Sequence, residues 1–137
     1  MPDFLPDRVE AGTVNVSGIA GLAAGMEEVE RVGIKTIFAR QQRQVRRCAA
    51  VLKKNGIPVF AGKGQAGVLS FLPGTDCQQM ADRLAEKGIA VRAGLHCAPL
   101  AHESAGTLST GTVRISFGHD AQDVHSTMLL SAIRKLS

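Results

Sequence analysis

One short string of this chain carries the residue types best suited to chemistry. Cys97 lies within Arg92-Ala-Gly-Leu-His-Cys97-Ala-Pro99, directly after a strand-like run. A thiol becomes a nucleophile as its thiolate, and nearby positive charge favours that form. His96 and Arg92 are the neighbours that could supply the charge. The string therefore predicts a reactive thiol on a loop; the alternative is a small buried cysteine, the common state of a free cysteine.

An arginine in the next strand-like segment is the second candidate. Residues 112–117 alternate, so that their apolar side chains face one side of a strand and Arg114 faces the other. A guanidinium on a strand is a rigid fork that holds a carboxylate through two hydrogen bonds. The alternative is an exposed arginine without a ligand. Because the connection that carries Cys97 leads from Arg92 into this strand, we expect the three side chains to converge.

The remaining cysteines and histidines predict neither a disulfide nor a metal site. Cys48 and Cys77 fall on the apolar faces of helical patterns, so both are expected in the core. Three widely spaced cysteines argue against a disulfide framework and against a Cys-x-x-Cys metal site. Cys97 and the histidines match no zinc spacing; these histidines are His96, His102, His119 and His125.

Composition indicates an ordinary globular domain. The chain has 137 residues, of which 45% are hydrophobic and 20% charged. No run has the length of a membrane span, and the N-terminus lacks the pattern of a signal peptide, so a cytoplasmic location without a membrane partner is expected. The net charge is +4, with basic residues gathered over 40–54. Without Trp or Tyr for base stacking, we favour a solvated helix face over nucleic-acid binding.

Hydrophobic periodicity predicts helices and strands in the order ααββαββα. We expect helices over 18–32, 34–54, 75–87 and 121–136, and strands over 57–61, 66–72, 89–93 and 112–117. A long loop over 94–111 then carries Cys97. The pattern indicates an α+β fold class, a small and mainly antiparallel sheet covered by helices, in a single domain over 1–137.

The same periodicity assigns the caps and faces of the helices. The third helix is expected to begin with a capping box at 75–78, and Asp120 is expected to cap the last helix. The first helix carries an apolar stripe that we expect to be a surface for association. The predicted inward positions are Ile34, Ile37, Phe38, Val45, Cys48, Ala49 and Leu52; Cys77, Met80, Ala81 and Leu84; and Val124, Met128, Ala132 and Leu136.

Three ordered motifs resemble one enzyme family. The string from Arg92 to Pro99 is similar to the active-site cysteine segment of cysteine desulfurases and selenocysteine lyases, which are pyridoxal-phosphate-dependent enzymes of the class V aminotransferase type. Residues 111–117 resemble the strand that carries their substrate-binding arginine, and residues 10–21 resemble their Glu-x-Gly-Thr-x-Asn segment. The resemblance covers nearly the whole chain and implies the C-terminal (small) domain of a fold-type I PLP-dependent transferase.

The resemblance also implies roles for individual residues. Cys97 would accept sulfur from a substrate cysteine as a persulfide, with alanine as the product. Arg114 would bind the substrate, and Arg92 and His96 would complete the substrate-binding surroundings of the thiol. The cofactor contacts, near the phosphate and across a homodimer interface, would come from Thr13 and Asn15. Implied partners are cysteine or selenocysteine and a sulfur-acceptor protein.

The departure from the family is the missing large domain, which supplies the Schiff-base lysine. Lys63 lies in a turn without the family's His-Lys context and is not expected to replace it. We therefore expect a fragment that binds no pyridoxal phosphate and does not catalyse the full reaction by itself. Two alternatives are a class V aminotransferase-type domain without desulfurase activity and a free-standing sulfur-carrier or interaction domain.

Overall fold

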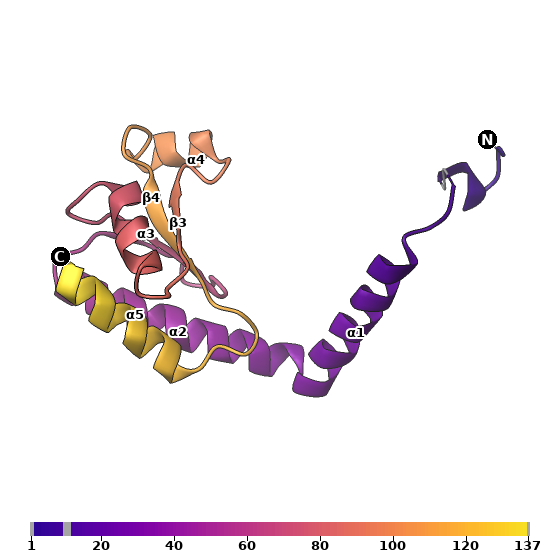
Figure 1. Ribbon diagram of the computed structural model, residues 1–137, viewed down its shortest axis with the longest axis horizontal. Helices are drawn as coiled ribbons and strands as arrows, with labels where there is room; N and C mark the ends of the chain where they lie inside the picture. Colours follow the sequence, from indigo (N-terminus) through magenta and orange to yellow (C-terminus); the bar gives the residue numbers. More distant parts are fainter. Residues whose placement is uncertain (1, 10–11, 137) are drawn as a thin grey trace. The chain divides into compact units, whose positions relative to one another are not determined.

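The computed structural model describes residues 2–9 and 12–136, and the chain divides into two compact units, Met1–Ile34 and Lys35–Ser137. The larger unit is built on a four-stranded sheet in the order β1-β2-β4-β3, with every neighbouring pair antiparallel (Figure 1). The α+β fold with a mainly antiparallel sheet is therefore confirmed. The strands are β1 (Val59–Phe60), β2 (Val68–Phe71), β3 (Arg92–Gly94) and β4 (Thr112–Ser116).

Three helices cover one face of this sheet. Helix α2 (Ile34–Lys54) and helix α5 (Asp123–Leu136) run side by side, and α3 (Cys77–Ala85) packs against β3 and β4 (Figure 1). Alternation along β2 and β4 turns their apolar residues towards these helices. The opposite face carries Ser70, Arg92 and Arg114 together with the apolar Phe60 and Val68. The largest fully buried side chains are Phe71, Leu52, Leu69, Met80, Leu84, Ile133, Gln44, Val113, Cys48 and Ser126.

Helix α2 is amphipathic as predicted, but the part of its apolar face that is buried is shorter than predicted. Val45, Cys48 and Leu52 are in the core, whereas Ile34 and Phe38 are 72% and 41% exposed. The first turns of α2 extend beyond the sheet, so the same apolar spacing buries nothing there. The core positions predicted at Ile34 and Phe38 were therefore wrong.

The last helix differs from the prediction in start and phase. It begins at Asp123 rather than at 121, so Asp120 does not cap it. Val124 and Met128 are 52% and 54% exposed instead of buried. The face of α5 that packs on the core is shifted by one residue from the predicted face and carries Leu129, Leu130 and Ile133. Two residues of the predicted face, Ala132 and Leu136, are buried as expected.

Two further boundaries shift for local reasons. The cap of α3 is Asp76, whose side chain accepts a hydrogen bond from the Gln79 amide at 2.9 Å, rather than Thr75. Strand β3 begins at Arg92, because residues 89–91 pack against the core before the chain pairs with β4.

The loop expected over 94–111 contains an additional helix, α4 (Pro99–Ser104). It starts with Pro99 in the first turn, where the missing amide proton costs nothing.

The smaller unit holds the 3-10 turn η1 (Asp7–Val9) and helix α1 (Val16–Val32). Asn15 caps α1 by accepting a hydrogen bond from the Gly18 amide at 2.9 Å. No residue of α1 is buried, and its apolar stripe lines a groove of about 500 Å³. Among the described residues, no helix combines the length and the apolar character needed to cross a bilayer. The groove is lined by Gly21, Leu22, Gly25, Met26, Val29, Glu30 and Ile34.

The exposed stripe of α1 should make the isolated chain associate as its concentration rises. Leu22 and Met26 are 65% and 57% exposed, and contiguous apolar surface of this kind drives association. Leu22→Glu should lower the association constant about tenfold or more, equivalent to about 1.4 kcal/mol of association free energy. Light scattering over a concentration series measures this. Val124→Glu, at a similarly exposed position on α5, is the matched control; an equal effect of both changes would contradict the role of α1.

Candidate functional site

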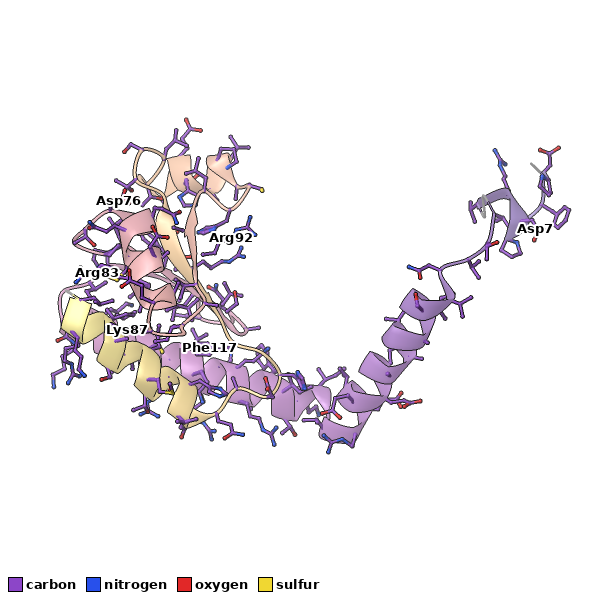
Figure 2. All side chains as sticks on the ribbon, viewed as in Figure 1. Asp7, Asp76, Arg83, Lys87, Arg92 and Phe117 are labelled. Carbon is purple, nitrogen blue, oxygen red and sulfur yellow. The ribbon has the colours of Figure 1, made fainter. Side chains whose placement is uncertain are left out.

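The face of the sheet opposite the three helices carries a row of side chains across all four strands. Phe60 pairs with Ser70, Ser70 with Arg114, and Arg114 with Arg92. The side chain of Arg92 projects from β3 on the side away from α3 (Figure 2). Like charges placed directly opposite each other on neighbouring strands are destabilising. The register therefore places two arginines opposite each other on one face of the sheet, at a cost that a bound anion would offset.

Arg114 contains an unused donor. It is half-buried in the middle of β4, and its Nε atom is buried without a hydrogen-bond partner among the described residues. A buried donor without an acceptor costs about 1–3 kcal/mol. A carboxylate is the natural acceptor, because its two oxygens match the spacing of the guanidinium donors. The prediction that Arg92 and Arg114 lie together is met by their register in the sheet.

Cys97 lies at the tip of a tight turn that follows β3. The Ala98 amide donates to the Leu95 carbonyl at 2.9 Å, and the two central residues, His96 and Cys97, have φ angles of 51° and 59°. Two successive positive φ angles are typical of a type I′ turn, which normally contains Asn and Gly. Strain of this kind costs about 1–3 kcal/mol per residue and clusters at functional sites. The thiol of Cys97 is exposed, so the alternative of a buried structural cysteine is excluded.

His96 is half-buried between the turn and the sheet. Its Nε2 atom lies 3.3 Å from the Thr112 hydroxyl, and its Nδ1 atom is buried without a partner among the residues that the structure describes. Burial, followed by the charge of Arg114, lowers the pKa of His96 below the ordinary value of 6.5. At neutral pH the ring is therefore uncharged. It can accept a proton from a neighbouring group, while the positive charge of the site comes from Arg92 and Arg114.

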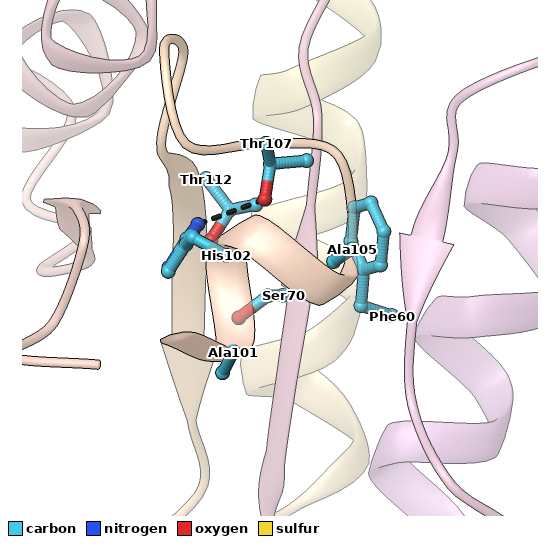
Figure 3. Close-up of a pocket in the computed structure, with 7 residues that line it drawn as sticks. All are labelled: Phe60, Ser70, Ala101, His102, Ala105, Thr107 and Thr112. Atoms are coloured by element: carbon cyan, nitrogen blue, oxygen red, sulfur yellow. Dashed lines mark hydrogen bonds between the residues drawn. The ribbon is translucent and has the colours of Figure 1, made fainter. Parts of the chain in front are cut away.

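Helix α4 forms one wall of an open pocket of about 150 Å³ on the same face of the sheet (Figure 3). The buried side chains of His102 and Thr107 meet in its wall, with His102 Nδ1 2.8 Å from the Thr107 hydroxyl. Sequence patterns could not predict this pair, because α4 has only six residues and neither the helix nor its direction follows from their order. The lining residues are Phe60, Ser70, Ala101, His102, Ala105, Thr107 and Thr112.

The other candidate residues fall elsewhere. Cys48 and Cys77 are buried, as predicted. Thr13 is exposed in the smaller unit. Asn15 belongs to the same unit, and its Oδ1 atom accepts hydrogen bonds from the Gly18 amide and the Ser17 hydroxyl, both at 2.9 Å. Within the described ranges, no group of three or more histidine, cysteine or carboxylate side chains is placed to hold a metal ion.

Comparison with known proteins identifies the family of this arrangement. The family model "Aminotransferase class-V" matches residues 3–125. The chain belongs to the class V aminotransferase family. A probable cysteine desulfurase of Pyrococcus abyssi is 38% identical over 117 residues, which are 82% of this chain and 28% of that protein. A probable cysteine desulfurase of Vibrio cholerae is 36% identical, covering 96% of this chain and 32% of that protein.

Over nearly its whole length, this chain has the same fold as a solved structure of a cysteine desulfurase. The apo structure of the cysteine desulfurase from Thermococcus onnurineus NA1 superposes with a TM-score of 0.88 at 34% identity, over 96% of this chain and 33% of that one. This class V chain therefore spans about a third of the length of its relatives. The prediction of a part of a cysteine desulfurase-like protein with a PLP-transferase fold is confirmed.

Enzymes of this family depend in general on pyridoxal phosphate. That cofactor needs a lysine for its Schiff base and a set of donors around its ring and phosphate. All six lysines of the chain are exposed, and none lies on β3, β4 or the connection between them; they are Lys35, Lys53, Lys54, Lys63, Lys87 and Lys135. The described residues therefore do not form a complete site for the cofactor.

Proposed function

We propose that residues 1–137 are a single domain that handles substrate and sulfur in a cysteine desulfurase, with the cofactor held by the rest of the enzyme. The observation that carries the proposal is the turn that presents the exposed Cys97 thiol at the end of the two strands on which Arg92 and Arg114 are paired. Arg114 binds the substrate carboxylate through its unused Nε donor, and Arg92 and His96 complete the pocket. Thr13 and Asn15 are proposed as contacts to the cofactor phosphate.

In the proposed reaction, Cys97 receives one sulfur atom from the substrate. Its thiolate forms a bond to the substrate sulfur, and the carbon–sulfur bond of the substrate breaks. The electron pair of that bond stays on the carbon, which takes up a proton and becomes the methyl group of alanine. A thiolate suits attack on divalent sulfur, and an exposed turn suits the later transfer of the sulfur to an acceptor.

The same residues support proposals for the substrate, the sulfur acceptor, the oligomeric state and the compartment. The substrate is cysteine or selenocysteine, and the sulfur leaves Cys97 to an acceptor protein that can reach an exposed turn. The enzyme is proposed to be a homodimer, supported by the apolar surface of α1. Three free cysteines favour a reducing compartment, and we propose the cytoplasm.

The test places this chain in a complete enzyme. The chain replaces the matching third of the Thermococcus onnurineus desulfurase, and alanine release from cysteine is measured together with the mass of the Cys97 peptide. The expected result is alanine production with a gain of one sulfur atom on Cys97. Cys97→Ser should lower alanine release at least about a hundredfold, because a hydroxyl is a poor nucleophile towards divalent sulfur.

Cys77→Ala is the matched control, because it removes a buried thiol remote from the site and should leave the persulfide in place. Alanine release from cysteine that survives Cys97→Ser would contradict the persulfide on Cys97; selenocysteine is run in parallel because its cleavage can tolerate the change. Transfer of the amino group to a keto acid, without a persulfide, would instead support a class V domain that lacks desulfurase activity.

A further inference from the structure

Two histidines lie close to the Cys97 thiol segment, His96 within the turn and His102 on α4, and each is hydrogen-bonded to a threonine. His96 Nε2 is 3.3 Å from the Thr112 hydroxyl, and His102 Nδ1 is 2.8 Å from the Thr107 hydroxyl. The two imidazole rings are in contact, with their centroids 5.8 Å apart and their planes tilted by 47°. His96 is the chain neighbour of Cys97, whereas His102 lies on α4 with its ring against the His96 ring.

The His102 side chain is fixed by burial and by hydrogen bonds, although it lies on a short helix. It is 7% exposed and Thr107 is 3% exposed, so their hydrogen bond is made away from solvent (Figure 3). The same two residues are also joined through the backbone, because the Thr107 amide donates to the His102 carbonyl at 2.8 Å. A second backbone bond, from the Gly111 amide to the Thr107 carbonyl at 2.8 Å, ties this pair to the start of β4.

We propose that His102 and Thr107 form a positioning pair: their hydrogen bond fixes the His102 ring against the His96 ring, and this contact holds His96 and the neighbouring Cys97 in the geometry used for sulfur transfer. The inference rests on the proposed function, because it concerns the same thiol. It assigns a role to two residues that lie outside both the Cys97 turn and the strand positions of the paired arginines.

The pair should control how readily His96 takes up a proton. His96 faces Arg114 on β4, Arg92 on β3 and His102 on α4, and all three positive or titratable groups disfavour a charge on its ring. Burial is the largest cause of its lowered pKa, and the His102 ring is part of what keeps water away. If the His102–Thr107 bond is broken, the His102 ring loosens and water reaches His96. The titration midpoint of His96 then rises towards 6.5.

Proton NMR titration of the 137-residue chain tests this directly, with the histidine signals assigned by single substitutions. Thr107→Val removes the hydroxyl at nearly constant volume and should raise the midpoint of His96. Thr107→Ser restores a hydroxyl and should restore the midpoint. His102→Asn keeps an amide group near the position of Nδ1 but removes the ring, so it should also raise the midpoint. The rate of Cys97 with 4,4′-dithiodipyridine should change with the same midpoint as His96, because a charged imidazole favours the neighbouring thiolate.

Thr110→Val is the matched control. The Thr110 hydroxyl lies in the same connection but donates only to the backbone carbonyls of Thr107 and Gly111, so its loss should leave the His96 midpoint unchanged. A midpoint unaffected by both Thr107→Val and His102→Asn overturns the positioning pair, as does an equal rise in Thr110→Val. Because the titration needs no substrate, a missing persulfide in the complete enzyme would refute the proposed function and leave this measurement standing.

Discussion

Iodoacetamide at pH 8 should modify Cys97 on the order of a thousand times faster than Cys48 in the folded chain. Cys97 is exposed, whereas Cys48 is 0% exposed. Burial raises the pKa of Cys48 to about 11, and the charge of Arg47 opposes this only in part. At pH 8 only about one Cys48 thiol in a thousand is then ionised, and even that one reacts only when the structure opens. Mass spectrometry of the alkylated peptides over time measures the ratio.

Cys77 serves as a second internal reference. It is 4% exposed, and burial raises its pKa, with a smaller contribution from the charge of Asp76. Cys97→Ser should remove the fast phase completely, and denaturant should make all three thiols react at similar rates. Equal rates for the three thiols in the folded chain would contradict both the special site at Cys97 and the core assignment of the other two.

The elements that could be predicted are those in which one physical cause dominates. Alternation along residues 112–117 indicated that Arg114 faces away from the apolar core, and the structure places it there because Val113 and Ile115 pack against the helices. Cys48 and Cys77 were predicted in the core for the same reason, since each lies on the apolar face of an amphipathic helix. The periodicity of apolar residues predicts which face of a segment is buried, and burial of that face stabilises the folded segment.

Features that depend on the local backbone or on remote partners could not be predicted. Helix α4 has only six residues, too few for a hydrophobic period, and it forms because it is tied to Ala98 and Thr107. The positive φ angles of His96 and Cys97 have no signal in the sequence, because neither residue is a usual turn former at those positions. Helix α1 and the first turns of α2 show the opposite case, in which apolar spacing is present but the apolar side chains remain exposed.

The site thus combines a part that sequence patterns define and a part that only the fold creates. The register that sets Arg92 opposite Arg114 follows from pairing of β3 with β4, and it creates a local excess of positive charge on the outer face. The turn then presents Cys97 at the end of the same two strands. A stable β3–β4 pair is therefore a condition for both the anion site and the position of the thiol. At the end of this pair, Gly111 lies directly against the backbone of Gly94.

Gly111→Ala should destabilise the fold by about 3 kcal/mol. Gly111 has φ +64°, a conformation that costs a residue with a side chain about 1–2 kcal/mol. A Cβ atom there would also lie 2.9 Å from Gly94 Cα and 3.0 Å from the Gly94 carbonyl carbon and oxygen. Those atoms are backbone and cannot rotate away, so β3 and β4 must separate at the base of the connection. Urea unfolding of the variant, compared with the unchanged chain, gives the difference in free energy.

Gly106→Ala separates the cost of backbone strain from the cost of the steric contact with Gly94. Gly106 lies in the same connection with φ +68°, but nothing lies within 4 Å of the position that its Cβ atom would take. This change should therefore cost only the backbone strain, about 1–2 kcal/mol. The excess cost of Gly111→Ala then measures how closely β3 and β4 must approach. Because the same separation moves Arg92 away from Arg114, Gly111→Ala should also weaken carboxylate binding in the complete enzyme, and Gly106→Ala should not; equal costs for the two changes would contradict the close approach.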